Sequence, residues 1–274
     1  MNLYRAETGI FVEQDSTFFR LPATDWDEVI CSERLFDEAT GATRGTAVSA
    51  GEIGTILAPV VSQEVWAAGV TYYRSRNARM EESKVAGGGD FYERVYDAAR
   101  PELFFKATGR RVVGTGTGVR IRTDATWSVP EPELTLVVNP AGKIIGYTVG
   151  NDMSSRDIEG ENPLYLPQAK VYDRSCALGP CVRLATEPIS KNVSISMKIV
   201  RAGQDVFTGN TSLTELKRNP KELVEYLFRD NSFPHGACLM TGTGIVPNDE
   251  FTLRSGDGIR ISIEGIGTLE NFVI

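Results

Sequence analysis

Two glutamates stand two residues apart in the stretch WSVPEPELTLVV (residues 127–138), where a strand-like pattern becomes apolar on both faces. Side chains alternate across a strand, so Glu131 and Glu133 share one face. Neighbouring carboxylates on a buried strand repel each other and lose hydration unless a cation, such as a divalent metal ion, compensates them. The alternative is a solvated pair at the end of an exposed edge strand, which the two prolines would suit. The stretch alone favours that alternative.

The residues after this strand add a third carboxylate. NPAGK (139–143) is typical of a turn, and an apolar strand returns after it. Antiparallel pairing centred on Ala141 predicts that Asn151 lies opposite Glu131. Asp152 then lies within one residue of the glutamate pair. Three carboxylates without a histidine or thiolate suit magnesium, manganese or calcium, and so few protein ligands leave coordination positions for a substrate.

Two charged segments lie further along the chain. Lys170 stands in a moderately apolar setting. A lysine near a metal-bound oxyanion can stabilise negative charge or, with a lowered pKa, move a proton. Without that context an ordinary surface lysine is the commoner interpretation. The run of Arg156, Asp157, Glu159 and Glu161 would by itself be interpreted as a solvated loop.

Two glycine-rich stretches resemble nucleotide-binding loops, but the residues after them oppose that interpretation. A phosphate loop needs a strand before it and a helix after it, so that amide groups at the helix start face the phosphates. Residues 114–118 (GTGTG) precede residues 119–122, which alternate like a strand, so we predict a hairpin turn. Residues 241–244 (TGTG) precede Ile-Val-Pro and an acidic turn, which also does not predict a helix.

The composition argues against several classes of function. The 274 residues suffice for one large domain, or for one domain with a smaller companion. The formal net charge of -7 gives no electrostatic reason to expect nucleic acid or an anionic membrane as a partner. No apolar run approaches the ~20 residues of a membrane span, and the start does not resemble a signal peptide. A cytoplasmic location is therefore expected.

Cysteine and histidine usage narrows the possible chemistry. The four cysteines form no Cys-x-x-Cys pair, which favours reduced core thiols over a zinc site or disulfides. His235 is the single histidine, and its position after Phe233-Pro234 suggests a loop residue. Ser-His-Asp or Cys-His chemistry would need this one residue, and a zinc site would lack its usual imidazoles.

Strands dominate the predicted secondary structure, which indicates a mainly β, mixed β/α fold and not a doubly wound sheet. Residues 1–59 are expected to form a small β-rich N-terminal domain. One helix is well signalled, because Asn219 can cap it, Pro220 suits its first position, and apolar residues follow at helical spacing. Short helices are also expected at 74–84 and 92–99. The main predicted strands are 103–106, 119–122, 134–138, 144–149, 193–200 and 259–263.

Four short motifs occur in an order and spacing that is specific in combination. They are Glu131-Pro-Glu133, GYTVGNDMSSRD (146–157), Lys170-x-x-Asp173 and Leu178-Gly-Pro180. From about residue 67 to the C-terminus the chain thereby resembles the fumarylacetoacetate hydrolase superfamily. The resemblance implies a mixed β-sandwich roll with a few short helices, formed by a catalytic domain at residues 60–274. It also implies a bound divalent metal, a small-molecule substrate, and a homodimer or homotetramer.

Residue by residue, the resemblance carries over a set of site residues. Lys170 matches the active-site lysine of the family and is implied to be catalytic. Arg156 matches an arginine on the substrate side, and Thr243 matches the threonine of a Gly-Thr loop that helps to hold the substrate. The implied ligands of Mg²⁺, or of Mn²⁺ or Ca²⁺, are Glu131, Glu133 and Asp152.

Two departures from the hydrolases of the family favour one branch of it. Members that cut carbon–carbon bonds commonly carry Gly-x-Asn-Tyr-x-x-His, whose histidine helps to activate water. Ser75, in GVTYYRS (69–75), stands in its place. Glu159 stands where hydrolases often have glutamine. Together with RDIEGENPLYLPQAK (156–170), these two residues make the chain resemble the 2-keto-3-deoxy-D-arabinonate dehydratases. This resemblance implies that Ser75 and Glu159 contact the substrate and that Glu102 is a catalytic residue near the metal.

That branch implies a magnesium-dependent hydro-lyase of sugar-acid degradation. The implied reaction converts a 2-keto-3-deoxy-pentonate, such as 2-keto-3-deoxy-D-arabinonate, to 2,5-dioxopentanoate. Removing a C3 proton and expelling the C4 hydroxyl needs no water nucleophile, which agrees with the missing histidine. The base is left open among Lys170, Glu102 and Glu159. The alternatives are a hydrolase of acylpyruvates or diketo-deoxy sugar acids, an oxaloacetate decarboxylase, and a metal-stabilised binding protein without activity.

Overall fold

The structure, a computed structural model, describes residues 1–73 and 94–274. Ser75 and the helix predicted at 74–84 therefore lie outside the described residues, as does the start of the helix predicted at 92–99. The labelled helices are α1 (Trp26–Cys31), α2 (Leu35–Ala42), α3 (Ala50–Ile53), α6 (Arg156–Glu161), α7 (Leu166–Lys170) and α8 (Pro220–Leu227). Residues 94–97, in the described part of the helix predicted at 92–99, are also helical. Short 3-10 turns are η1 (Gly109–Arg111), η2 (Pro163–Tyr165) and η3 (Leu213–Glu215).

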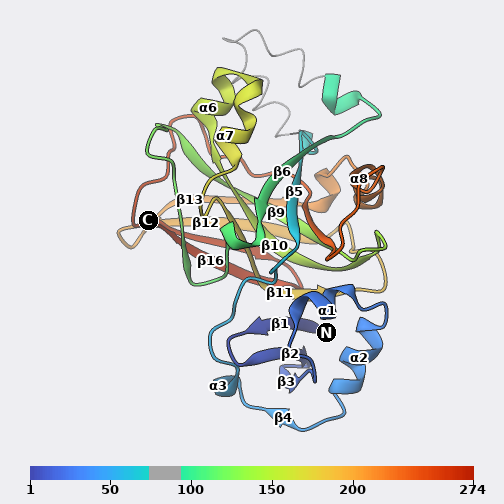
Figure 1. The fold of residues 1–274 in the computed structure, drawn as a ribbon. Helices are drawn as coiled ribbons and strands as arrows, with labels where there is room; N and C mark the ends of the chain where they lie inside the picture. Colours follow the sequence, from blue (N-terminus) through green and yellow to red (C-terminus); the bar gives the residue numbers. More distant parts are fainter. Residues whose placement is uncertain (74–93) are drawn as a thin grey trace.

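Two sheets make up most of the structure, so the mainly β prediction is confirmed (Figure 1). The larger sheet has the order β4 (Ala47–Val48), β3 (Thr17–Arg20), β2 (Gly9–Gln14), β1 (Asn2–Ala6), β11 (Cys176–Leu184), β10 (Ile144–Ser155), β9 (Ser128–Val138), β14 (Ala237–Met240), β5 (Glu64–Gly69), β6 (Glu102–Thr108), with β7 (Val112–Val113) beside β11. The smaller sheet has the order β13 (Gln204–Ser212), β12 (Ser194–Arg201), β15 (Gly258–Ile263), β16 (Gly267–Val273), β8 (Thr117–Val119).

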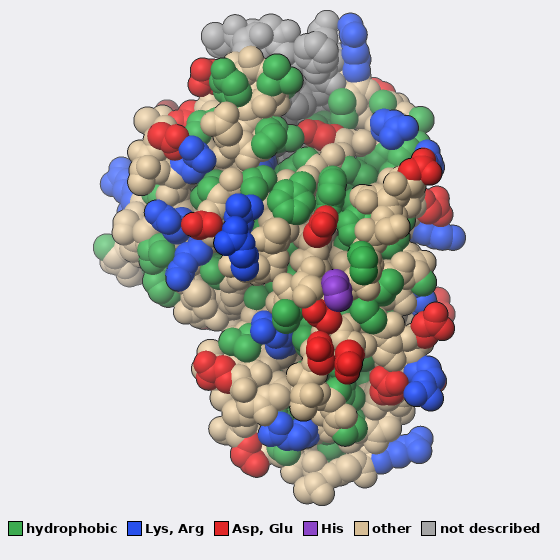
Figure 2. All heavy atoms as spheres, in the orientation of Figure 1, with side chains coloured by type: hydrophobic (Ala, Val, Ile, Leu, Met, Phe, Trp, Pro, Cys, Tyr) green, Lys and Arg blue, Asp and Glu red, His purple; other side chains and the backbone are tan. Residues whose placement is uncertain are grey.

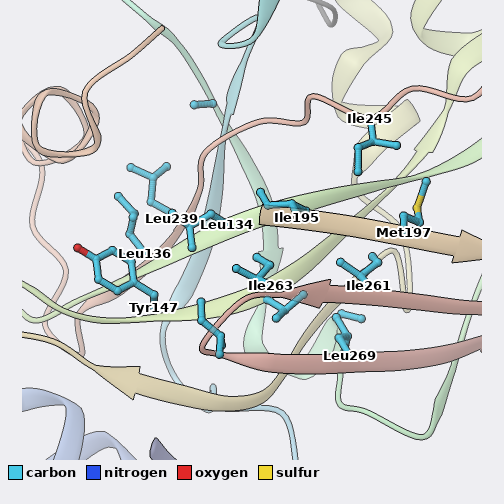
Figure 3. Close-up of a cluster of buried hydrophobic side chains, with 14 of the residues drawn as sticks. Leu134, Leu136, Tyr147, Ile195, Met197, Leu239, Ile245, Ile261, Ile263 and Leu269 are labelled. Atoms are coloured by element: carbon cyan, nitrogen blue, oxygen red, sulfur yellow. The ribbon is translucent and has the colours of Figure 1, made fainter. Parts of the chain in front are cut away.

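Strands β9 and β10 lie inside the larger sheet and are buried along nearly their whole length. One face of β9 carries Leu134 and Leu136, which share an apolar core with Ile195 and Ile261 of the smaller sheet (Figure 3). The opposite face carries Val137, which belongs to a second apolar cluster with residues of α1 and α2. The exposed-edge interpretation of the two glutamates is therefore wrong, because β9 is an interior strand with apolar layers on both sides.

The N-terminal strands extend the larger sheet. β1 pairs with β11, and β2 to β4 continue outward from it, at the bottom of Figure 1. Three helices that the sequence analysis did not predict also form here. Asp25 caps α1 by accepting hydrogen bonds from the backbone N–H groups of Asp27 and Glu28, and Trp26 and Ile30 are buried. Residues of β1, β2, α1 and α2 thus share one apolar cluster with the interior of the sheet, whereas Ile53 of α3 lies in a separate small cluster with Ala6 and Phe11.

Two predictions around residues 114–122 are wrong. β8 ends at Val119, so the strand predicted over 119–122 forms only at its first residue. Residues 114–118 do not close a hairpin, because β7 before them pairs with β11 of the larger sheet and β8 after them pairs with β16 of the smaller sheet. The glycines instead carry the chain from one sheet to the other. As predicted, neither this stretch nor residues 241–244 is followed by a helix in this described part of the chain.

The predicted helix after Asn219 is confirmed. Asn219 Oδ1 accepts a hydrogen bond from the backbone N–H of Lys221 at 2.9 Å, and Pro220 is the first helical residue. Leu223 and Leu227, four residues apart, are buried and join the core between the two sheets. The helix therefore forms because its cap satisfies an orphan N–H group and its apolar stripe packs on the sheet.

The cysteine thiols agree with the expectation of reduced thiols, and three of them, Cys176, Cys181 and Cys238, are buried. All four cysteines are free, and burial raises the pKa of the Cys238 thiol to about 12. His235 lies in the loop before β14, with 53% of its side chain exposed. Acidic and basic side chains are interspersed on the face shown in Figure 2. Among the described residues, no helix is long and apolar enough to cross a membrane.

Candidate metal centre

A bulge in the β9–β10 hairpin decides which side chains meet. The hairpin begins in the predicted register, but an irregularity between Ile144 and Gly146 shifts it by one residue. Asp152 therefore pairs with Glu131, and the prediction that Asn151 lies opposite Glu131 is wrong. Because successive side chains of a strand point to opposite faces, this shift puts a carboxylate, and not an amide, on the face of the glutamates.

Three carboxylates converge at this end of the hairpin. Ligand oxygens of Glu131, Glu133 and Asp152 lie within 4.8 Å of one another, and the three residues are 5%, 2% and 0% exposed. Burial, together with the charges of Asp152 and Glu131, raises the pKa of the Glu133 carboxyl well above its ordinary value. A compact set of carboxylate oxygens is what hard divalent cations prefer as ligands.

Among residues 1–73 and 94–274, three buried cations face these carboxylates. Arg156 Nη2 lies 2.6 Å from Glu131 Oε1. Lys170 Nζ lies 2.8 Å from Glu131 Oε2 and 3.0 Å from Asp152 Oδ2. Lys106 Nζ lies 2.5 Å from the other oxygen of Asp152, Oδ1. The surface-lysine interpretation of Lys170 is therefore wrong, because its ammonium is buried against two members of the triad.

The donor set of the cluster fits a divalent metal ion. Glu159 is also buried, with Oε1 4.0 Å from Lys170 Nζ, so the described residues bring four buried carboxyl groups together here. Burying several carboxylates close together is costly unless cations compensate their charge. A divalent cation at the triad would supply two positive charges, and its three carboxylate ligands fit magnesium.

Two short helices after β10 carry three other predicted site residues, Arg156, Glu159 and Lys170. α6 begins at Arg156, directly after the strand, and Glu159 follows one turn later on the same side of the helix, so both side chains are buried. The solvated-loop interpretation is therefore wrong for these two residues. α7 ends at Lys170, whose ammonium also donates a hydrogen bond to Ser154 Oγ at 2.6 Å.

The Gly-Thr loop after β14 closes one side of the triad. The backbone N–H of Gly242 donates to Glu133 Oε2 at 2.5 Å, and Thr243 lines the same pocket as the triad. Gly242 has a φ of +92°, and a Cβ there would lie 2.0 Å from Thr71 Oγ1. Only glycine combines this backbone conformation with so close an approach, so the residue type is needed to bring the N–H donor to Glu133.

Val70 lines this pocket in a strained backbone conformation. Its φ is +52°, a left-handed value that β-branched residues rarely adopt and that costs about 1–3 kcal/mol. The residue after it is held on two sides: Thr71 Oγ1 donates to Thr241 O at 2.6 Å, and Thr71 O accepts the N–H of Lys217 at 3.0 Å. The surrounding structure thus maintains the strain next to the triad, which is typical of functional sites.

Glu102 lies at the rim of the pocket and not in the triad. It is the first residue of β6, is half-buried, and lines a neighbouring hollow with Pro163 and Leu166. Its carboxylate lies over its cross-strand partner Gly69, which does line the pocket of the triad. A Cβ at Gly69 would lie 2.0 Å from Glu102 Oε2, so the glycine makes room for the carboxylate.

Three groups at the centre were not predicted from the sequence: the Lys106 ammonium, the Ser154 hydroxyl and the Gly242 N–H. The signal for Lys106 was its place in an apolar strand, where side-chain alternation puts it on one face with Glu102 and Phe104. A lysine is almost never fully buried unless it is paired, so a lysine inside an apolar strand predicts a buried carboxylate nearby. Ser154 and Gly242 gave no comparable signal, because only the folded chain brings them to charged side chains.

The chain is similar to two dehydratases over most of its length. It is 52% identical over 217 residues to the probable 2-keto-3-deoxyxylonate dehydratase of Haloferax volcanii, covering 78% of this chain and 73% of that protein. It is 43% identical over 244 residues to the 2-dehydro-3-deoxy-D-arabinonate dehydratase of Saccharolobus solfataricus, covering 86% and 81%. A solved structure of 2-keto-3-deoxy-D-arabinonate dehydratase complexed with magnesium and 2,5-dioxopentanoate matches with a TM-score of 0.84 and 36% identity, covering 100% of this chain and 98% of that one.

A family model matches a large C-terminal part of the chain. The match covers residues 71–274, and the model is described as fumarylacetoacetate (FAA) hydrolase C-terminal. That range is well over half of the chain and contains the whole carboxylate triad together with Arg156 and Lys170. The two-sheet fold and the motif resemblance agree with it. The chain therefore belongs to the fumarylacetoacetate hydrolase family.

Proposed function

We propose that this protein is a magnesium-dependent dehydratase, a lyase that converts a 2-keto-3-deoxy-pentonate, such as 2-keto-3-deoxy-D-arabinonate, to 2,5-dioxopentanoate. The observation that carries the proposal is the buried carboxylate triad with the Lys170 ammonium against two of its members. It occurs in a chain 52% and 43% identical to dehydratases of such sugar acids, and one matching structure holds magnesium and 2,5-dioxopentanoate together.

The residues around the triad suggest how the substrate is held. When bound, magnesium supplies Lewis acidity that makes the C3 protons beside the keto group more acidic. Arg156 and Thr243 line the pocket, and we assign them to substrate oxygens. Ser75, which the resemblance assigns to the same role, lies outside the described residues. The proposed magnesium ligands are Glu131, Glu133 and Asp152.

Lys170 is the proposed proton-transfer residue. Its Nζ lies in the pocket between the triad and the Phe104 ring, 5.7 Å from the ring centroid, so a substrate above the triad meets it directly. As base, Lys170 takes one C3 proton, and the C4 hydroxyl leaves as water with a proton from Glu159 or Glu102. The product of this step has a C3=C4 double bond. Transfer of a proton from C5 to C3 turns it into the C4=C5 enol, which tautomerises to the C5 aldehyde. One water leaves in total, and no water is consumed.

Gly69→Ala tests the role of Glu102. The added Cβ should displace the Glu102 carboxylate at little cost in folding, because only the far end of a flexible side chain has to move. If this carboxyl donates the proton, kcat falls by roughly 100-fold, the lower end of the 10²–10⁴ that a positioned acid contributes. Glu102→Gln should lose at least as much. Gly41→Ala, whose Cβ meets nothing within 4 Å, is the control, and normal kcat in G69A would leave Glu159 as the proton donor.

We also propose a domain division, a cellular location and an oligomeric state for the enzyme. We assign catalysis to residues 60–274 and a separate domain to residues 1–59, although β1 pairs with β11. The four free cysteines suit a reducing compartment, and we propose a cytoplasmic location. A homodimer or homotetramer is proposed from the family, and sedimentation of the magnesium-loaded protein tests it. No nucleic acid or membrane is proposed as a partner.

The first experiment compares two substrates. Purified, magnesium-loaded protein is incubated with 2-keto-3-deoxy-D-arabinonate and, separately, with an acylpyruvate, and the products are identified by mass. Loss of one water from the sugar acid, abolished by a chelator and restored by magnesium, is the expected result. Release of pyruvate from the acylpyruvate, with the sugar acid unchanged, would instead make the protein a hydrolase in which another residue replaces the missing histidine.

A further inference from the structure

Of the two lysines that the described residues place at the triad, Lys106 and Lys170, the proposed reaction does not use Lys106. It lies on β6 and is fully buried, and its ammonium has a partner for each of its three N–H donors. Nζ lies 2.5 Å from Asp152 Oδ1, 2.9 Å from Met153 O and 2.6 Å from Lys170 O. The three partners come from the end of β10 and the end of α7, so a single side chain ties together the two elements that carry the triad and the proton-transfer residue.

The two lysines contact Asp152 in different ways. Lys170 reaches Oδ2 and Glu131 Oε2, which belong to triad residues that line the pocket, and it also donates to a serine hydroxyl. Lys106 reaches Oδ1, and its other two partners are backbone carbonyls, which cannot move without moving the strand and the helix. Lys106 does not line the pocket, whereas Lys170 does. A cation that enters the pocket can therefore bind Asp152 Oδ2, whereas Asp152 Oδ1 is already paired with Lys106.

We propose that Lys106 is a positioning residue of this enzyme, which holds Asp152 Oδ1 so that Asp152 offers the metal a single oxygen, and which fixes Lys170 through its backbone carbonyl. A buried ion pair that served only stability would be a poor solution, because apolar side chains of the same volume usually serve as well. Residues that hydrogen-bond to a metal ligand set the orientation of that ligand. Loss of such a residue typically lowers metal affinity or activity by about 10–100-fold. The inference rests on the proposed function only for its turnover measurement.

The test is Lys106→Met, which removes the ammonium and keeps the length and volume of the side chain. Turnover of the sugar acid is expected to fall about 10–100-fold in kcat with little change in KM. With cobalt(II) in place of magnesium, the visible absorption spectrum is expected to differ from that of wild type, because Asp152 can then offer both oxygens and change the coordination number. The spectrum needs no substrate, so it tests the inference even if the sugar acid is not turned over.

Arg201→Met is the matched control. It breaks another ion pair, in which Arg201 Nε lies 2.7 Å from Asp257 Oδ1 and Asp257 is fully buried, away from the triad. R201M should lose stability and keep the wild-type cobalt spectrum. A wild-type spectrum and wild-type kcat in K106M would overturn the inference. If K106M does not fold, a crystal structure of the magnesium-loaded wild type decides: Lys106 on Oδ1 with the metal on Oδ2 supports it, and a metal bound by both Asp152 oxygens overturns it.

Discussion

Glu133→Gln is expected to lower kcat/KM for the sugar acid by about 10³-fold or more, because Lewis-acid catalysis contributes several kcal/mol to the rate. Glutamine keeps the shape of the side chain and can still accept the Gly242 N–H, so the pocket keeps its form. What is lost is one anionic oxygen ligand of the three carboxylates. Magnesium affinity, measured by calorimetry, and turnover should therefore fall together.

The same substitution should change how the stability of the metal-free protein depends on pH. Because the folded-state pKa of Glu133 is raised, the folded protein keeps this proton at pH values where the unfolded chain has lost it. The free energy of unfolding of the metal-free wild type therefore falls as pH rises from the ordinary carboxyl pKa through the raised one. E133Q lacks this part of the slope, and thermal unfolding across that pH range measures the difference.

Magnesium should stabilise the wild type more strongly as pH rises, because the metal has to displace the Glu133 proton in order to bind. Glu161→Gln is the matched control, since it removes a negative charge from an exposed position on α6. It should leave metal affinity and turnover unchanged. Wild-type magnesium binding by E133Q would show that the triad is not the metal site, whichever substrate the enzyme takes.

The triad could be predicted from sequence because its residues are close along the chain and joined by one hairpin. The register between them could not, since the turn residues fix pairing only up to the first irregularity. At Gly146 a Cβ would lie 2.6 Å from Arg183 O, so the strand approaches β11 closely next to the bulge. That contact is between strands distant in sequence. A prediction from the turn alone therefore gave Asn151, and the resemblance to the family gave Asp152.

Burial was the other property that local patterns predicted poorly. Lys170 and Arg156 were interpreted as surface residues because neither has its carboxylate partner nearby in the sequence: those partners lie on β9 and β10. A charged side chain is buried only where an oppositely charged partner lies beside it. The sequence around Lys170 or Arg156 does not reveal that partner, because it lies in another segment of the chain. The short helix α1 was missed for a related reason, since it is too short to show a full helical period and is held by the Asp25 cap.

Lys170→Met is expected to lower kcat by about 10²–10⁴-fold, the contribution of a well-placed general base. Magnesium affinity should stay the same or increase. The ammonium occupies Glu131 Oε2 and Asp152 Oδ2 in this structure, so removing its charge removes a competitor for those oxygens. Kinetics and magnesium titration of the same preparation measure both effects. Lys143→Met, at an exposed position in the β9–β10 turn, is the control and should change neither.

The separation of these two effects is what identifies the base. A residue that only supports the fold would weaken magnesium binding and turnover together, whereas a base lost from a filled site leaves the metal bound and the chemistry slow. If K170M keeps its kcat, Glu159 is the next candidate, because its carboxylate lies 4.0 Å from Lys170 Nζ in the same buried cluster. Lys170→Met should also keep the cobalt spectrum closer to wild type than Lys106→Met does, since Lys106 would still hold Asp152 Oδ1. The two lysines can then be assigned separately, one to proton transfer and one to positioning.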